Sequence, residues 1–292
     1  MSPIDPSLSI RRVRLAVSDL DASTRFYSRV LGLPVIERDD TRSALGTDPA
    51  LPALELLALE DALAPRPGST GLFHVAWLHP SRADLAETVR RVAAAGWRFT
   101  GASDHGVSEA LYLDDPDGLG IELYADRPRE DWARPAGGGV EMVTLPLDLE
   151  DLLAASDGVP APEIAPGTGI GHVHLKVADV DRAAAFYEGL GFEEQARMPS
   201  AAFVSAGGYH HHLGLNSWQS AGGAADGDRA PGLRLVDFAL ADTVALDELA
   251  RAAETIDAAP RRENGSLLLS DPDGETLRFS ASSPPAPADR RS

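Results

Sequence analysis

The chain contains two stretches that read almost alike: VRLAVSDLDASTRFYSRVLGL at residues 13–33 and VHLKVADVDRAAAFYEGLGF at residues 173–192. Each begins with alternating apolar residues, a pattern typical of a strand. An aspartate, Asp21 or Asp181, follows at a position suited to a helix start, and the amphipathic stretch after it contains Phe-Tyr and ends at a Leu-Gly pair. The repeat therefore predicts a strand followed by a helix in each half of the chain.

A second repeat alternates with the first. GLFHVAWL at 71–78 and GLRLVDFAL at 232–240 look like opening strands, and each is followed by a helical pattern. Both then reach the turn sequence DPDG, at 115–118 and 271–274, before a further apolar strand. The two repeats together predict four related strand–helix–strands units, near residues 9–61, 70–128, 168–218 and 232–280.

The units group into two halves of the chain. We expect an N-terminal half over residues 1–128 and a C-terminal half over 167–282. The segment 129–166 between them is rich in proline and glycine, so it is interpreted as a linker, with a short helix in LDLEDLLAAS. The Pro-rich tail 283–292 is expected to be disordered.

Composition excludes several classes of function. The 26 basic and 45 acidic side chains give a net charge of −19, which disfavours binding to nucleic acid or to an anionic membrane surface. No apolar run is long enough to cross a membrane, and the N-terminus does not resemble a signal peptide, so a cytoplasmic protein is expected. With no cysteine and eight histidines, a metal site would have to use His, Asp or Glu.

Four such units resemble the vicinal oxygen chelate superfamily, which includes glyoxalase I, bleomycin-resistance proteins and the extradiol ring-cleaving dioxygenases. The resemblance covers nearly the whole chain except the linker and the tail. It implies an α+β fold in which four βαβββ modules form two cupped, barrel-like sheets. It also implies that the metal ligands come from the first and last strands of two paired modules.

The implied ligand positions differ between the modules. The first-strand positions fall on Arg12, His74, His172 and either Leu235 or Val236, and the last-strand positions fall near Glu55 and on Glu122, His212 and Arg278. Side chains that can bind a cation thus concentrate in the second and third modules. We therefore predict that modules two and three share the working cup, whereas modules one and four form a structural cup.

His74, His172 and Glu122 would make a set of two imidazoles and one carboxylate. This set is typical of non-haem Fe(II) oxygenases, because three protein ligands on one face leave positions open for substrate and dioxygen. Mn(II) could take the place of Fe(II) with the same ligands. His174 lies two residues from His172 on the same strand face, so it is a competing ligand or a pocket residue.

The segment SDHGVSEALYLDDPDGLGIELY is similar to the signature of the extradiol dioxygenases, and only Ser103 departs from it. The matching residues, in order, are His105, Leu111, Tyr112, Asp115, Pro116, Gly118 and Glu122. The resemblance implies that Tyr112 hydrogen-bonds the metal-bound substrate oxygen and that His105 lines the pocket. GGYHHHLGLN resembles the catechol 2,3-dioxygenase branch, which implies that His212 is the catalytic acid/base.

Structural interpretations compete with these roles. A lone histidine such as His74 is more often a core residue, and the run His210–His212 could be a surface patch. We expect His210 and Trp218 to line the pocket with His174, and we interpret His79 as an exposed bystander.

The sequence thus predicts an Fe(II)-dependent extradiol dioxygenase similar to catechol 2,3-dioxygenase, with a small aromatic diol as substrate and dioxygen as co-substrate. The first alternative is a glyoxalase-like isomerase or lyase that uses His74, Glu122, His172 and His212 as four ligands to Zn, Ni or Co. The second is a non-catalytic protein that binds an aromatic ligand. The exposed edge strands of this fold are compatible with a homodimer.

Overall fold

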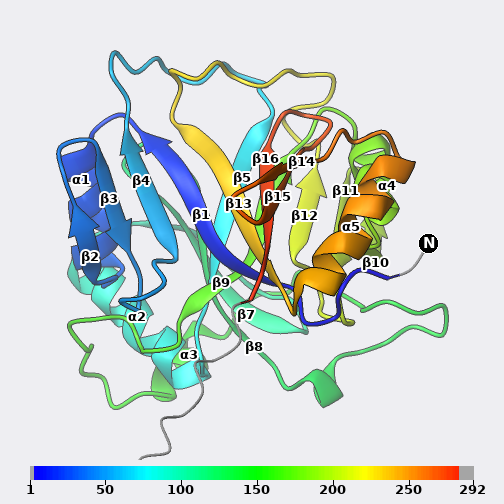
Figure 1. Cartoon of the computed structure of the whole chain (residues 1–292). Helices are drawn as coiled ribbons and strands as arrows, with labels where there is room; N and C mark the ends of the chain where they lie inside the picture. The colour runs from blue at the N-terminus through cyan, green and yellow to red at the C-terminus, as the bar shows by residue number, and fades with distance from the viewer. Residues whose placement is uncertain (1–2, 283–292) are drawn as a thin grey trace, which may run out of the picture.

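The computed structural model describes residues 3–282, so the expected disorder of the tail lies outside the described residues. The strands form two eight-stranded sheets (Figure 1). The first sheet contains β1 (Ser9–Val17), β2 (Val35–Arg38), β3 (Arg42–Leu45), β4 (Leu54–Ala58), β13 (Gly232–Leu240), β14 (Arg261–Glu263), β15 (Ser266–Ser270) and β16 (Thr276–Ala281). The second contains β5 (Gly71–Leu78), β6 (Phe99–Asp104), β7 (Ser108–Asp114), β8 (Gly120–Asp126), β9 (Gly169–Lys176), β10 (Glu193–Met198), β11 (Ala201–Ser205) and β12 (Leu213–Asn216).

Strand order confirms the predicted α+β fold and the predicted pairing of the modules. The first sheet joins modules one and four through the antiparallel pair β1–β13, and the second joins modules two and three through the antiparallel pair β5–β9. Each sheet therefore takes one module from either half of the chain, and neither half forms a sheet of its own.

Helices cover the outer sides of the sheets and follow the first strand of each module. Figure 1 shows α4 and α5 together at one end of the molecule. Asp19 and Asp179 cap α1 and α4, while the predicted residues Asp21 and Asp181 lie in the first turns. The helical segments are α1 (Leu20–Arg25), the π-helical η1 (Phe26–Val30), α2 (Arg82–Ala94), the 3₁₀ turn η2 (Arg129–Asp131), α3 (Leu149–Ala154), α4 (Val180–Gly189) and α5 (Thr243–Thr255).

The two sequence repeats meet in space. The Tyr27 hydroxyl donates a hydrogen bond of 3.1 Å to the buried carboxylate of Asp115, the first residue of one DPDG turn. Tyr187 donates in the same way, also at 3.1 Å, to Asp271 in the other. The second carboxylate oxygen of each aspartate accepts backbone N–H groups of its own turn. The Phe-Tyr motif of one module therefore fastens the closing turn of the next.

These aspartates predict a pH dependence of stability. Burial raises the pKa of Asp271 to about 6, above the value of about 3.9 expected in the unfolded chain. Its contribution to folding is therefore fully present below about pH 4 and is lost as the pH rises through about 6. Asp271→Asn keeps an acceptor for the backbone of the turn and does not titrate. Between pH 4 and pH 7 we therefore expect the free energy of unfolding of wild type to fall by about 2–3 kcal/mol relative to that of the variant. Urea unfolding across that range measures it, and parallel curves for the two proteins would contradict the assignment.

Ion pairs occupy the centre of the first sheet. On the first strand of module one, Arg14 lies beside Glu55 of β4, and in module four Asp237 lies beside Arg278 of β16. Arg14 and Arg42 both bind Glu55 at 2.5 Å, and Arg12 and Arg278 both bind Asp237. Each buried carboxylate is thus neutralised by guanidinium groups, which leaves no unpaired carboxylate there to bind a cation.

Loss of one of these carboxylates is expected to destabilise the fold. In Asp237→Asn the guanidinium groups of Arg12 and Arg278 lose their counter-charge. Asp237 is 1% exposed but its partners are 18% and 25% exposed, so solvent screening reduces the effect, and we expect a loss of about 2–3 kcal/mol in urea unfolding. Asp181→Asn is the control, because that carboxylate is 94% exposed and pairs with Arg197 on the surface. Equal losses in the two variants would contradict the prediction.

The segment 129–166 contains η2 and α3, and α3 falls within the stretch predicted to be a short helix. Part of this segment is attached to the second sheet, because Trp132 and Val140 form a small apolar cluster with Val107 and Tyr209. In the described part of the chain, no helix combines the length and the apolar character that crossing a membrane requires.

Candidate metal centre

Three side chains converge at the middle of the second sheet. His74 lies on β5, Glu122 on β8 and His172 on β9. Nε2 of His74 is 2.9 Å from Oε2 of Glu122, Nε2 of His172 is 3.0 Å from the same oxygen, and the two Nε2 atoms are 3.4 Å apart. All three side chains are buried.

The strand register explains this convergence. Ala76 of β5 is the register partner of Glu122 on one side and of His172 on the other. Residues two apart on a strand share a face, so His74 points to the same side as its neighbours. Because Ala76 is small, the longer side chains around it can meet above the sheet.

The donor set fits a divalent metal ion. Neighbouring ligands of a six-coordinate ion with bonds of about 2.1 Å lie about 3.0 Å apart, close to the separations found here. Burial lowers the pKa of His172 to about 4, so its ring is neutral near pH 7. Burial alone would raise the pKa of Glu122, but hydrogen bonds to the two imidazoles hold it well below the usual range. A neutral imidazole and an ionised carboxylate are the forms that bind metal.

A cavity of about 300 Å³ opens beside these three residues. Glu122 and His74 line it, and its wall is mostly apolar and aromatic. The predicted pocket residues His105, Tyr112, His174 and Trp218 all line it, and His210 does not. Further lining residues include Phe73, Met142, Val143, Met198, Phe203 and His211.

His105 and Tyr112 form a hydrogen-bonded pair in the cavity wall. Nδ1 of His105 lies 2.7 Å from the carbonyl oxygen of Val143, which can only accept, so this nitrogen carries the proton. Nε2 is then the acceptor of the Tyr112 hydroxyl, 2.7 Å away. Burial and the nearby Glu122 carboxylate raise the pKa of Tyr112, so its hydroxyl stays protonated. The signature residues His105, Tyr112 and Glu122 are thus brought to one cavity.

His174 lies in the cavity wall rather than among the converging donor atoms. Within residues 3–282, the two groups whose donor atoms lie within 4.8 Å of one another are His74, Glu122 and His172, and His172, His210 and His211. The geometry therefore favours His172 over His174 as the ligand. The ring of His174 instead packs against Gly214, where an added Cβ would come within 2.8 Å of it.

The structure does not place His212 where the sequence analysis expected it. Its Nδ1 accepts a backbone hydrogen bond of 3.2 Å from Ala206, and the side chain does not line the cavity. His211 lines the cavity instead, with its ring centre 4.0 Å from that of His172. The expectation came from the resemblance, which put His212 on the last strand of module three, but β12 begins only at Leu213 and His212 precedes it.

The last-strand position of module three belongs to Gly214, not to His212. Gly214 pairs with His174 as Glu122 pairs with Ala76 in module two. A glycine brings no donor to this place, so three side chains, those of His74, Glu122 and His172, remain as candidate ligands. The four-ligand set of the glyoxalase-like alternative is therefore not assembled by the described residues.

A chain of hydrogen-bonded polar side chains, which ends at the half-buried Asp126, reaches His211. Nδ1 of His211 is 2.8 Å from Nδ1 of His210, and Nε2 of His210 is 3.0 Å from the Asp126 carboxylate. Asp126 is not among the predicted site residues, and the neighbouring Arg127 binds Asp104. The signal that could have found Asp126 is its spacing of four from Glu122 on β8, because even spacing puts both on one face.

His79 is buried, contrary to the prediction of an exposed residue. Its Nε2 lies 3.1 Å from the hydroxyl of Thr88 on α2, and its Nδ1 lies 3.1 Å from the carbonyl oxygens of Trp77 and Tyr124. It joins α2 to the second sheet and has no contact with the cavity.

Comparison with known proteins agrees with this arrangement. Residues 9–123 and 169–279 match the Glyoxalase/Bleomycin resistance protein/Dioxygenase superfamily, and the chain belongs to this superfamily. It is 38% identical over 280 residues to the catechol-2,3-dioxygenase of Bacillus subtilis (strain 168), which covers 93% of this chain and 96% of that protein.

Two further comparisons concern a second dioxygenase and a solved structure. Biphenyl-2,3-diol 1,2-dioxygenase 2 of Rhodococcus globerulus is 30% identical over 115 residues, 39% of this chain and 60% of that protein. The crystal structure of glyoxalase I from Zea mays has a TM-score of 0.56 at 18% identity, covering 94% of this chain and 92% of that one. The last comparison shows a shared fold alone.

Proposed function

We propose that the protein is an Fe(II)-dependent extradiol dioxygenase of the cytoplasm that opens the ring of a catechol-type aromatic. The observation that carries this proposal is the convergence of His74, His172 and Glu122 beside a largely apolar cavity, which His74 and Glu122 line. Mn(II) suits the same donors. The identity to a catechol-2,3-dioxygenase over most of both chains supports the same reaction.

His74, His172 and Glu122 would hold the ion, and the cavity beside them would give a substrate access to it. The ion, when bound, would supply Lewis acidity and the positions at which diol and dioxygen meet. Phe73, Phe203 and Trp218 give the cavity an aromatic wall that suits a flat ring and excludes water from it.

Tyr112 and His105 are proposed to handle a proton of the diol. Because the Tyr112 hydroxyl donates to His105, its oxygen is available as an acceptor for a substrate hydroxyl. Nδ1 of His105 donates to the Val143 carbonyl oxygen, and this hydrogen bond fixes the orientation of the ring. The pair therefore orients the substrate and can take up a proton at Nε2 of His105.

We propose His211, rather than His212, as the catalytic acid/base. Asp126 accepts the proton on Nε2 of His210, which makes Nδ1 of His210 an acceptor. Nδ1 of His211 then donates to it, which leaves Nε2 of His211 without a proton. A neutral imidazole with a free Nε2 beside the ligand His172 can move a proton to and from the reacting oxygens.

This chain of hydrogen bonds makes Asp126 a positioning residue. Asp126→Ala removes the acceptor of His210, so we expect kcat to fall about 10- to 100-fold, with a displaced pH profile, while metal content is unchanged. Asp126→Asn keeps an acceptor oxygen and should recover most of the rate. Steady-state oxygen uptake measures both variants. Equal losses in the two variants, without a change in pH profile, would show a merely structural role.

Anaerobic reconstitution tests the function as a whole. Apoprotein loaded with Fe(II) and given catechol and oxygen is expected to consume oxygen and form a yellow, ring-opened product. Parallel samples with Mn(II) and Zn(II) identify the metal. Absence of oxygen uptake with several catechols would contradict the proposal. Catechol binding without uptake would instead indicate an aromatic-ligand binding protein.

A further inference from the structure

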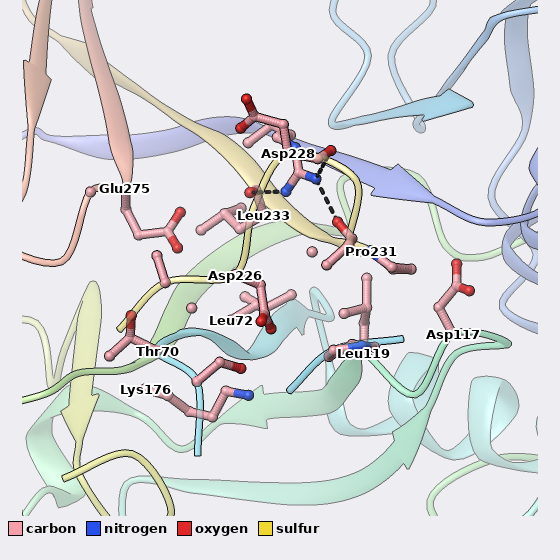
Figure 2. Close-up of a pocket in the computed structure, with 18 of the residues that line it drawn as sticks. Thr70, Leu72, Asp117, Leu119, Lys176, Asp226, Asp228, Pro231, Leu233 and Glu275 are labelled. Carbon is pink, nitrogen blue, oxygen red and sulfur yellow. Dashed lines mark hydrogen bonds between the residues drawn. The ribbon is translucent and has the colours of Figure 1, made fainter. Parts of the chain in front are cut away.

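A second cavity, of about 280 Å³, lies between the two sheets (Figure 2). It shares no lining residue with the cavity of the metal centre. Its walls are the starts of β5 and β13, the end of β9 and the two turns that precede β8 and β16. Residues from modules two, three and four meet here with residues from the connections between modules. They include Thr70, Leu72, Leu119, Lys176, Leu233 and Glu275.

Two chain connections close the cavity on one side. The segment 59–70 between modules one and two runs beside the segment 217–231 between modules three and four (Figure 1). Thr70 and Ala225 form an isolated parallel bridge, Leu63 donates a backbone hydrogen bond of 2.9 Å to Arg229, and Arg66 pairs with Asp226 at 2.8 Å. These contacts hold the two connections together and so define one edge of the cavity.

Lys176 and Glu275, a base and an acid, both line this cavity. Lys176, the only lysine in the chain, is the register partner of Gly71 on the next strand. A carboxylate oxygen of Glu275 lies 3.7 Å from the place of a Cβ on Gly71. Both side chains therefore flank the same glycine, and Figure 2 shows them on neighbouring walls. Yet within residues 3–282 neither head group has an ion-pair partner within 4.0 Å.

The other charged side chains of the cavity already form hydrogen bonds with protein groups, or lie at its edge. Arg234 donates to the carbonyl oxygens of Leu233, Asp228 and Ala230. Asp226 is bound to Arg66, and Asp117 accepts from the backbone of Ser18 at 2.9 Å. Asp228 is exposed at the rim. Lys176 and Glu275 are therefore the ionisable side chains of this cavity that are left to meet a ligand, beside the guanidinium group of Arg234, whose two terminal nitrogens already donate hydrogen bonds.

The electrostatics of Glu275 point the same way. Burial, and then the neighbouring Asp271, raise the pKa of Glu275 to about 8, against the opposing effect of Arg234 and Lys176. Near pH 7 Glu275 is therefore mostly protonated in the absence of a ligand, and a cationic group placed beside it would favour the ionised carboxylate. Lys176 similarly lacks an anionic partner, so each wall of the cavity is complementary to one charge of a small molecule.

We propose that this cavity binds a small zwitterion of the amino-acid type, with its ammonium group at Glu275 and its carboxylate at Lys176. A ligand with both charges suits an acid and a base that do not pair with each other, because its ammonium group would favour ionisation of Glu275 and its carboxylate would meet Lys176. The volume lies at the lower end of ligand pockets, which limits the ligand to a short chain.

A series of ω-amino acids of increasing length tests how far apart the two head groups of the site lie. Glycine, β-alanine, 4-aminobutyrate and 6-aminohexanoate are titrated into the whole protein by calorimetry, with butyrate and butylamine as single-charge controls. We expect one chain length to bind at least about tenfold more tightly than either control, because only it reaches both head groups. Equal affinities for the zwitterions and the controls would overturn the proposal.

Variants assign the binding to the two head groups. Lys176→Gln and Glu275→Gln should each reduce the affinity for the best zwitterion to that of a single-charge control. Lys176→Arg keeps the charge and should keep binding, with a preference for a different chain length. Asp228→Asn at the rim is the matched control and should bind as wild type does. Wild-type affinity in both glutamine variants would overturn the assignment. Oxygen uptake plays no part in this readout, so failure here is distinct from failure of the proposed dioxygenase function.

Discussion

Replacing Glu122 by glutamine is expected to abolish metal retention and turnover while the fold persists. The amide keeps the shape of the side chain but removes the negative charge that two imidazoles share in this buried place. Loss of an outer partner of a ligand typically costs about 10- to 100-fold in metal affinity or activity, so loss of a ligand should cost about 1,000-fold or more. Metal analysis after gel filtration and oxygen uptake with catechol measure the two effects.

Glu55 offers a matched control for this experiment. It occupies the corresponding place on β4 of the first sheet, beside Arg14 as Glu122 is beside Ala76. Glu55→Gln is expected to lower the free energy of unfolding and to leave metal content per folded molecule unchanged, because its carboxylate is neutralised by two arginines. If Glu122→Gln kept full metal content and rate, the ligand assignment would be wrong.

His211 and His212 are adjacent, and their replacement by asparagine is expected to have opposite consequences. Asparagine can reproduce hydrogen bonding at the place of Nδ1 but has no group at the place of Nε2. His211→Asn should therefore lower kcat by about 10²- to 10⁴-fold, the usual worth of a general acid or base. His212→Asn should keep kcat and lose at most about 1 kcal/mol of stability, since its Nδ1 accepts only the Ala206 amide.

Steady-state oxygen uptake at saturating catechol distinguishes the two variants, and metal content is measured beside it because His211 adjoins His172. A variant at His212 that lost its rate with full metal content, while His211→Asn remained active, would return the acid/base role to His212. That result would also show that residues 206–212 rearrange when substrate binds.

The module pairing was predictable because it rests on residue types that chemistry restricts. Arginine at positions 12 and 278 cannot bind a cation, whereas His74, Glu122 and His172 can. Their distribution predicts which modules share a sheet, and the strand order confirms it. The closing DPDG turns and the Phe-Tyr helices were recognised as separate repeats, but their contact through Tyr27 and Asp115 was not, because it joins residues far apart in the chain.

The role of the histidine run was harder to predict for a local reason. Alternation assigns faces only within a strand, and Gly207 and Gly208, both with positive φ, turn the chain just before the histidines. The second cavity gave no sequence signal at all. Lys176 and Glu275 come from different modules and approach each other only through the register of β5 and β9 and the turn before β16.

The strand order has a consequence for the origin of the candidate metal centre. Glu122 and His74 belong to one half of the chain and His172 and His211 to the other, and both sheets are joined at the seam between the halves. The two half-chains are therefore related to each other as two subunits of a dimer would be, except that the segment 129–166 links them. The candidate metal centre lies where the two half-chains meet. A cut within that segment would leave two fragments, each with an incomplete ligand set, so that metal binding would become a measure of their association.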